Sequence, residues 1–115
     1  MEEKMNQEGM NTVPEEEQQP DLILKLGDPF RFDGQEYTEL DLSGLFDLTA
    51  MDMAEIDRRM QVMGYSYARP EVTGVYAMLV AARVNHKPWE FCQKMKARDM
   101  IRLRETVRAF FYAQG

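Results

Sequence analysis

The sequence predicts an α+β fold that is mainly helical, with a short N-terminal antiparallel β-hairpin or small sheet followed by three to four packed helices. Two observations support this fold class. An Asp-Gly pair at residues 33–34 separates two short segments whose apolar side chains alternate, which is typical of a tight hairpin. After this hairpin, apolar residues recur at intervals of three and four, the period of helices that pack on one face.

Residues 1–20 are predicted to form a disordered acidic tail, and residues 21–115 a single small domain. The tail has too little apolar surface to offset the loss of chain entropy on folding. The charge reverses between Lys94 and Arg108, where basic residues dominate. Two hypotheses remain open: both charged runs are simply solvated, or the tail folds back over the basic helix and screens a partner site. The acidic residues of the tail are Glu2, Glu3, Glu8, Glu15, Glu16 and Glu17.

The hairpin is expected over residues 22–42. Leucines alternate with other residues from 22 to 26, which favours a first edge strand, and residues 27–29 are expected to turn the chain. Phe30 and Phe32 then share one face of the strand that enters the Asp-Gly turn. Because two or three short strands are not stable alone, the sheet must bury its phenylalanines against the helices.

Capping residues mark where the helices begin and end. Thr49 is a good N-cap with Asp52 three residues later, and Gly64 suits a left-handed C-cap. Pro70 and Pro88 are each expected to begin a further helix. The four expected helices cover approximately residues 50–63, 71–85, 88–94 and 97–112.

The helix faces predict the core. Gly74 lies inside the second helix, where glycine costs about 1 kcal/mol relative to alanine, so it is expected to permit close approach of another backbone. Ile101 and Phe111 lie beside the inner line of the last helix. The inner lines are Met53, Ile56, Met60 and Met63; Val72, Tyr76, Leu79 and Val80; and Met100, Leu103, Val107 and Phe110.

Catalytic, metal and cofactor sites are not predicted. His86 lies in a polar loop and is expected to be solvent-exposed, whereas Cys92 is expected to be a buried structural thiol. A single cysteine cannot form an intramolecular disulfide, which fits a reducing cytoplasm. On the first helix, carboxylates adjoin Arg58 and Arg59, so surface ion pairs are expected; these carboxylates are Asp52, Glu55 and Asp57.

The overall charge and the apolar runs argue against two classes of partner. A formal net charge of −6 disfavours general nucleic-acid binding. No apolar run approaches the roughly 20 residues needed to span a bilayer, and the N-terminus lacks a signal pattern. The sequence therefore predicts a soluble protein that binds neither membrane nor nucleic acid.

Four segments carry a resemblance to a known family: FRFDGQEYTELDLSGL at 30–45, LTAMDM at 48–53, VYAMLVAARV at 75–84 and KARDMIRLRETVRAFF at 96–111. In their order they resemble the tail assembly chaperones of long-tailed bacteriophages and prophages, especially the group that starts with a short β-hairpin. Many relatives have a Gly-Leu-Pro-like turn before the short helix. This chain has Asn85, His86, Lys87 and Pro88 there, and only the proline matches.

The resemblance implies a non-enzymatic protein of the host cytoplasm that is absent from the mature virion. Such chaperones bind the aggregation-prone tape measure protein, keep it soluble and help recruit the tail tube protein during phage tail assembly. Their genes lie between those of the tail tube and the tape measure, and a longer frameshifted form is common. Many form dimers or rings, so the resemblance also suggests a homo-oligomer.

The methionine content is compatible with client binding. The chain has ten methionines, and an unbranched, polarizable side chain can repack around different apolar helices. Ordinary core filling is the alternative for any single methionine. Residues just off the packing lines are the predicted partner-binding residues, and a helix-in-groove contact is the expected mode. They are Met51, Met63, Phe111 and Tyr112.

Two other functions remain open. A small phage DNA-binding regulator could use the basic last helix, with Arg98, Arg102 and Arg104 reaching phosphates or base edges. Alternatively, the protein could be a structural tail component that stays in the virion.

Overall fold

The computed structural model describes residues 22–113, so the predicted acidic tail at residues 1–20 lies outside the described residues. The predicted fold class is confirmed, since a two-stranded antiparallel hairpin precedes three α-helices and several short 3-10 helices. The strands are β2 (Ile23–Phe32) and β3 (Gln35–Asp41), and the α-helices are α1 (Ala50–Val62), α2 (Gly74–Val84) and α3 (Ala97–Phe111). The 3-10 helices are η3 (Ser43–Asp47), η4 (Pro70–Val72) and η5 (Trp89–Cys92).

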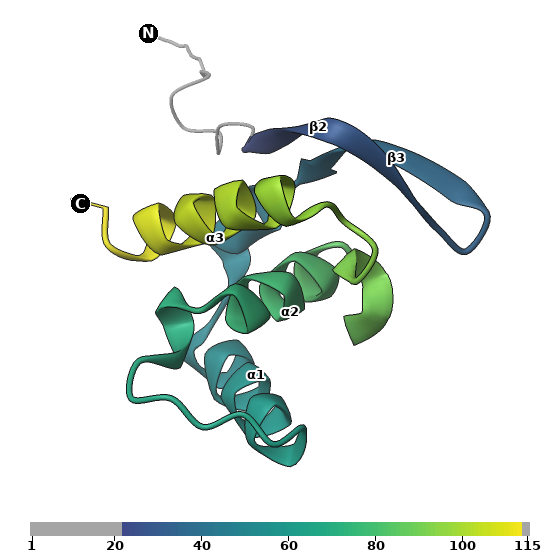
Figure 1. Ribbon diagram of the computed structural model, residues 1–115. Coiled ribbons are helices and arrows are strands. Elements are labelled where there is room, and N and C mark those ends of the chain that lie inside the picture. The colour runs from purple at the N-terminus through teal and green to yellow at the C-terminus, as the bar shows by residue number, and fades with distance from the viewer. Residues whose placement is uncertain (1–21, 114–115) are drawn as a thin grey trace, which may run out of the picture.

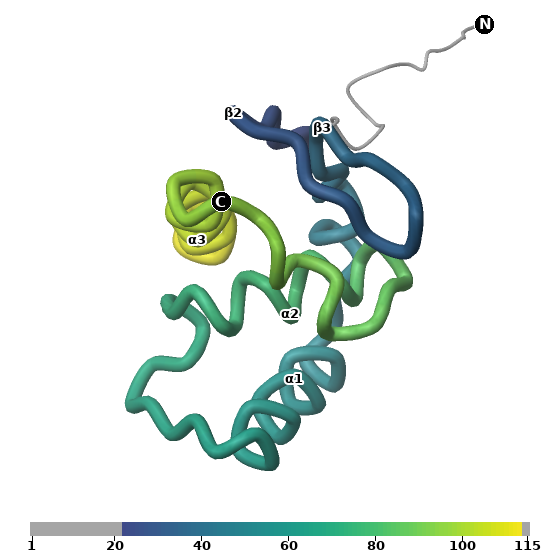
Figure 2. The backbone as a smooth tube through the Cα atoms, turned by 45° about the vertical axis from the view of Figure 1, so that its right-hand side comes forward, coloured from purple at the N-terminus to yellow at the C-terminus, as the bar shows by residue number. Residues whose placement is uncertain are grey.

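The elements are stacked with α2 in the middle. Figure 1 shows the hairpin lying over α3, α3 over α2, and α2 over α1. In Figure 2 the hairpin and α3 lie side by side above α2, with α1 below it, and α2 packs against α1, α3 and η5. The described helices include none that is long and apolar enough to cross a membrane.

The hairpin turn forms as predicted. Asp33 and Gly34 both have positive φ angles, 53° and 79°, which are the left-handed conformations of a type I′ turn. Phe32 pairs with Gln35 directly beside this turn. Two cross-strand ion pairs add to the ladder: Lys25 Nζ lies 3.0 Å from Glu39 Oε1, and Arg31 Nη1 lies 3.7 Å from Glu36 Oε1.

Residues 27–29 do not turn the chain, and this expectation was wrong. The strand β2 continues through them to Phe32, and its register shifts between Lys25, which pairs with Glu39, and Phe30, which pairs with Tyr37. Residues 26–29 of β2 therefore stand opposite a single residue of β3. The segment is a β-bulge, which bends the strand and withdraws backbone donors from the ladder without ending it.

A buried carboxylate accounts for the bulge. Asp99, in the first turn of α3, is only 2% exposed. Its Oδ1 accepts a hydrogen bond of 2.9 Å from the Gly27 N–H, and its Oδ2 accepts one of 3.1 Å from the Asp28 N–H. Arg102 Nη1 donates a third, of 3.1 Å, to Oδ1. The backbone donors freed by the bulge are thus satisfied, and β2 is fastened to α3.

An aromatic cluster holds the other end of the hairpin. The Phe91 ring of η5 makes edge contacts with three hairpin rings, at centroid distances of 5.5 Å to Phe30, 5.3 Å to Phe32 and 5.0 Å to Tyr37. Such edge-to-face pairs are favourable beyond the area they bury. The prediction that the hairpin buries its phenylalanines against the helical part is confirmed for Phe30, whereas Phe32 is only half-buried.

The ends of α1 match their sequence signals. The Asp52 N–H donates to Thr49 Oγ1 at 3.1 Å, and the Thr49 N–H donates to Asp52 Oδ2 at 2.8 Å, which completes a capping box. At the other end Gly64 has a φ of +94°, and the Tyr65 N–H reaches back to the Met60 carbonyl at 2.9 Å. This is a Schellman C-cap, as the glycine predicted.

The second and third predicted helices need correction. Pro70 begins only the short η4, and α2 starts later because Thr73 Oγ1 accepts a hydrogen bond of 3.2 Å from the Tyr76 N–H and caps it there. The segment expected to be helical over 88–94 is the 3-10 helix η5. The Thr73 cap, and not Pro70, therefore sets the start of α2, which lies about one helical turn after the predicted start.

The core lies around α2, and most of its predicted residues are buried. Tyr76, Leu79 and Val80 of α2 are all buried, but Ile101 of α3 is exposed. A Cβ at Gly74 would lie 2.7 Å from Met100 Sδ. The glycine therefore makes room for a methionine side chain, and the expected close approach of another backbone was wrong. The buried core includes Leu24, Phe30, Leu40, Leu42, Leu45, Ile56, Met60, Ala77, Phe91, Leu103 and Val107.

Candidate functional site

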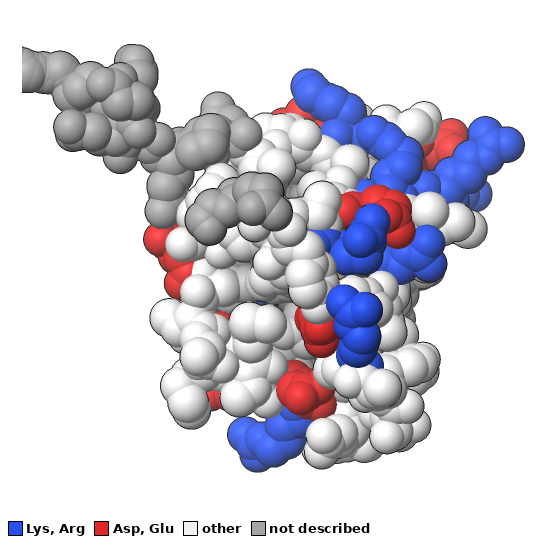
Figure 3. Space-filling model, turned by 90° about the vertical axis from the view of Figure 1, so that its left-hand side faces the viewer, with Lys and Arg blue, Asp and Glu red and all other residues white. Residues whose placement is uncertain are grey.

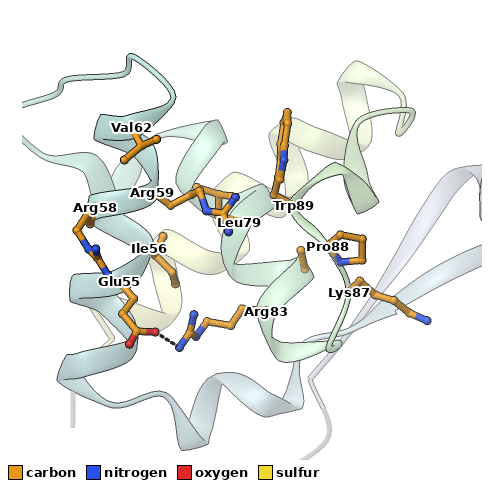
Figure 4. Close-up of a pocket in the computed structure, with 11 residues that line it drawn as sticks. Glu55, Ile56, Arg58, Arg59, Val62, Leu79, Arg83, Lys87, Pro88 and Trp89 are labelled. Atoms are coloured by element: carbon orange, nitrogen blue, oxygen red, sulfur yellow. Dashed lines mark hydrogen bonds and ion pairs between the residues drawn. The ribbon is translucent and has the colours of Figure 1, made fainter.

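A groove of about 460 Å³ runs between α1 and α2 and is bordered by the corner that leads into η5. Figure 4 shows Val62 of α1 and Trp89 of η5 on opposite sides, with Arg59 and Leu79 between them. We call this feature the α1–α2 groove. It is lined by Glu55, Ile56, Arg58, Arg59, Val62, Leu79, Ala82, Arg83, Lys87, Pro88 and Trp89.

The floor of the α1–α2 groove is apolar. Ile56 and Leu79 are 3% and 7% exposed, so the core continues into the groove at these side chains. Above the floor, Trp89 is half-buried and Val62 is 79% exposed. An apolar side chain so exposed, next to a tryptophan and a buried floor, offers surface that a partner would cover.

One face of α1, over the second half of the helix, borders the groove. Glu55, Arg58, Arg59 and Val62 follow the i, i+3, i+4, i+7 spacing that places residues on the same side of a helix. The seven residue steps from Glu55 to Val62 rise about 10 Å along the helix axis. The groove therefore follows the second half of α1 as an elongated hollow.

Arg83 ties α1 to α2 at one end of the groove. Its Nη2 donates to Asp52 Oδ1 at 2.8 Å and to Glu55 Oε1 at 2.6 Å. These contacts raise the pKa of Arg83, and the pKa of Asp52 is lowered by the backbone hydrogen bond from Thr49 and then by Arg83. Ion pairing of these carboxylates was expected, but the partner comes from another helix and not from the adjoining arginines.

Three cations on the groove are left without a carboxylate partner. Arg58, Arg59 and Lys87 form no ion pair with any other residue in the range 22–113. Arg83 is already neutralised by its two carboxylates. The groove therefore combines an apolar floor with a rim of unneutralised positive charge.

The predicted partner-binding residues do not line this groove. Met51 is 68% exposed at the start of α1, and Met63 is half-buried at its C-cap, so about 18 Å of helix separates them. Phe111 is half-buried, with its ring 6.2 Å from that of Tyr76. Tyr112 is exposed at the end of α3. Met51 and Met63 therefore lie at opposite ends of α1 and do not adjoin each other.

Tyr112 has fixed contacts of its own. Its hydroxyl donates a hydrogen bond to Glu71, which lowers the pKa of that carboxyl. The guanidinium of Arg69 lies 5.2 Å from the Tyr112 ring centroid. These contacts hold the last turn of α3 against the segment around η4.

Cys92 and His86 have the exposures that the sequence predicted. Cys92 is a buried thiol, and burial raises its pKa to about 12. His86 is exposed and lines a second hollow, of about 410 Å³, with Asp47 and Asp52 among its neighbours. Over residues 22–113 there is no group of three or more histidine, cysteine or acidic residues that could hold a metal ion.

The backbone at His86 takes a conformation that favours glycine. Its φ is +58°, and the Lys87 N–H donates to the Ala82 carbonyl at 2.8 Å across it. His86 thus occupies the left-handed position of a Schellman C-cap that ends α2. The signal for this turn was weak in the sequence because glycine is the usual residue there.

The basic residues of α3 are mostly neutralised. Arg102 pairs with Asp99 at 3.1 Å, Arg108 with Glu105 at 2.8 Å, and Arg104 with Glu105 at 3.3 Å. Figure 3 shows lysine and arginine side chains interrupted by acidic ones on the face it draws. The basic run in the sequence does not become an uninterrupted basic surface.

Comparison with protein-family models, with curated proteins and with solved structures finds no match to this chain.

Proposed function

We propose that this protein is a phage tail assembly chaperone that binds the tape measure protein, keeps it soluble and helps recruit tail tube subunits. The proposal places it in the host cytoplasm during assembly and outside the mature virion. The proposal rests on the family resemblance of the sequence and on the physical properties of the α1–α2 groove.

The observation that carries the proposal is the apolar floor of the groove. Ile56 and Leu79 are continuous with the core, and Trp89 and Val62 stand above them. An elongated apolar groove of this kind suits one face of an amphipathic helix. A long helical client offers such faces repeatedly, and covering them would prevent its self-association.

The corner after α2 adds support. Relatives of the resembled family carry a Gly-Leu-Pro-like turn before the short helix, and in this chain His86 precedes Lys87 and Pro88. Because His86 has a φ of +58°, the backbone there is one that glycine adopts without strain. The departure from the family pattern at this position is therefore a change of side chain on a compatible backbone.

The alternative of a DNA-binding regulator receives less support. Of the three arginines considered for it, Arg102 and Arg104 are engaged with Asp99 and Glu105. A phosphate would have to displace these carboxylates. Tight binding of duplex DNA at low salt, measured by filter binding, would favour this alternative over the chaperone.

Co-expression is the direct test of the chaperone proposal. The client to use is the tape measure protein whose gene the proposal places next to this one, expressed alone and together with this chain. We expect the soluble fraction of the tape measure after centrifugation to rise when this chain is present. An unchanged soluble fraction would refute the proposal.

Mass spectrometry of purified virions tests the assembly role against that of a structural tail component. We expect the tail tube and tape measure proteins in the particles and no stoichiometric amount of this chain. Its presence at the level of a tail protein would favour the structural component.

Phe111 is not a suitable position for testing the predicted partner-binding residues. Its ring is half-buried against Tyr76, so an aspartate there would weaken the fold as well as any contact. Met51→Asp is the cleaner variant, because Met51 is 68% exposed. Loss of tape measure solubility with this variant would support the prediction for Met51.

A further inference from the structure

We infer that the α1–α2 groove binds an amphipathic helix whose apolar stripe is flanked by acidic side chains. The inference rests on the proposed function and deepens it, since it states the chemistry of the client segment. It is carried by the charges around the groove together with the shape of its floor.

The charge of the rim differs from that of the rest of the protein. Residues 1–21 contain seven of the 20 acidic residues and one of the 14 basic residues, so they account for the whole net charge of −6. The remainder of the chain is neutral. Against this neutral background, four basic residues and one acidic residue line the groove.

Ion pairing within the protein leaves this positive charge in place. Arg83 is held by Asp52 and Glu55, but Arg58, Arg59 and Lys87 have no carboxylate partner among the described residues. A partner that supplied carboxylates beside its apolar stripe would neutralise them. A partner with lysines there would meet like charges at close range.

The shape of the groove points to a helix. The lining residues of α1 extend over about 10 Å of the helix, and the floor beside them is formed by Ile56 of α1 and Leu79 of α2. A helix lying along α1 could place apolar side chains at i, i+3 or i+4 on Leu79 and Trp89. Its flanking residues would then face the rim cations.

The lining chemistry argues against a small-molecule ligand. Small-molecule sites place a few fixed polar groups against a largely enclosed ligand. Here the polar lining consists of long arginine, lysine and glutamate side chains, and Arg58, Arg59 and Glu55 are exposed. Such charges select among partner helices more effectively than they orient a compact ligand.

Two synthetic peptides test the inference with the full chain. Each is a helix of about 14 residues, close to the length of α1, with a leucine and tryptophan stripe. One carries glutamates beside the stripe and the other lysines. We expect the glutamate peptide to bind at least about tenfold more tightly in fluorescence anisotropy, with an advantage that shrinks at high salt. Equal affinities would overturn the inference.

A charge-reversed pair of variants locates the binding. Arg58→Glu combined with Arg59→Glu should weaken binding of the glutamate peptide by about tenfold and strengthen binding of the lysine peptide. The matched control is Lys94→Glu combined with Lys96→Glu, which makes the same charge change at exposed residues outside the groove. An equal loss with the control would overturn the inference, because it would show a response to net charge alone.

Two other possible occupants of the groove, the chain's own acidic segment and a second copy of the chain, would give different experimental results. Replacing Glu15, Glu16 and Glu17 by glutamine in the full chain should leave peptide affinity nearly unchanged. An increase of about tenfold would assign the groove to the chain's own acidic segment and overturn the inference. A dimer in sedimentation that the Arg58→Glu and Arg59→Glu changes dissociate would instead assign it to a second copy.

The co-expression assay separates this inference from the proposed function. If the original chain keeps the tape measure soluble and the Arg58→Glu/Arg59→Glu variant does so equally well, the groove inference fails and the chaperone proposal stands. If the original chain does not solubilise the tape measure, the chaperone proposal fails. The peptide experiments then still decide what the groove binds.

Discussion

The junction between the hairpin and α3 uses charge in the opposite way to the α1–α2 groove. At the junction, the Asp99 carboxylate is buried and accepts hydrogen bonds from Gly27, Asp28 and Arg102. At the groove, Arg58 and Arg59 are exposed and have no partner among residues 22–113. The first arrangement stabilises the fold, whereas the second leaves two positive charges available to a binding partner.

This difference indicates how roles are divided within a small domain. Hydrogen bonds to a buried charge are strong, and breaking them leaves unsatisfied backbone donors. Exposed, unpaired cations contribute little to stability and can be changed without unfolding the chain. Substitutions at the junction should therefore affect stability, and substitutions at the groove should affect binding.

The largest expected effect is at Phe91 of η5, whose aromatic cluster fastens the other end of the hairpin and, like the junction, stabilises the fold. Phe91→Ala removes the ring that contacts Phe30, Phe32 and Tyr37 and should lower the free energy of unfolding by about 3–5 kcal/mol. Urea unfolding followed by circular dichroism measures this.

The matched control lies two residues away on the same 3-10 helix. Trp89 is half-buried on the groove, so Trp89→Ala should cost only about 1–2 kcal/mol. Circular dichroism is the required probe because Trp89 is the only tryptophan. Equal losses for the two variants would contradict the division between junction and groove.

The second effect is at the buried carboxylate. Asp99→Ala leaves the Gly27 and Asp28 N–H groups without an acceptor and should lower the free energy of unfolding by about 2–3 kcal/mol. Hydrogen exchange should show loss of protection at these two amides first. Glu105→Ala is the control on the same helix, since it removes only exposed ion pairs and should change stability little. A fully protected bulge in Asp99→Ala would contradict the role of this carboxylate.

The third effect is a dependence of stability on pH. The backbone hydrogen bond from Gly27 is the largest cause that lowers the pKa of Asp99 below its ordinary value of 3.8. A carboxyl whose pKa is lower in the folded state stabilises the protein above pH 3.8, and this stabilisation is lost as pH falls through 3.8 towards the folded-state pKa.

Comparison with Asp99→Asn isolates this group. The stability advantage of the original chain over the variant should be constant near about pH 7 and shrink below about pH 4. The other carboxyls whose pKa is lowered, Asp52, Glu71 and Glu105, are present in both proteins and cancel. If the stability advantage of the original chain grew on acidification instead, the charged form of Asp99 would not be the stabilising one.

The smallest expected effect is at the turn that ends α2 and places Lys87 beside the groove. His86 has a φ of +58°, so His86→Gly should raise the free energy of unfolding by about 0.5–1 kcal/mol and the melting temperature by a few degrees. Asn85→Gly is the neighbouring control. Asn85 has a negative φ, and its amide donates to the Asp41 and Ala81 carbonyls, so this change should destabilise. Stabilisation by both changes would rule out the backbone at His86 as the cause.

Local sequence signals predicted the elements whose geometry depends on neighbouring residues. The Asp33–Gly34 turn, the Thr49–Asp52 capping box and the Gly64 C-cap all formed as expected. Each satisfies backbone groups within a few residues, so tertiary contacts are not needed to specify it. The helical periodicity likewise predicted the buried faces, including Ile56, Leu103 and Val107.

Contacts between distant residues were not predictable in this way. Asp99 accepts hydrogen bonds from backbone groups 71 and 72 residues away, and it converts an expected turn at residues 27–29 into a bulge. Likewise, Asp52 pairs with Arg83 of α2 and not with the nearby Arg58 and Arg59 of its own helix. No local pattern specifies which distant donor a carboxylate will meet.

The sequence alone determined the α+β class, both ends of α1 and the burial of Cys92, because periodicity and capping are properties of short stretches of chain. Only the tertiary structure decided the bulge and the α1–α2 groove. The groove exists because α1, α2 and η5 pack with Val62 and Trp89 on opposite sides and with Arg83 pairing Asp52 and Glu55. Which charges remain unpaired after folding depends on where all the others find partners, and that is a property of the whole packed molecule.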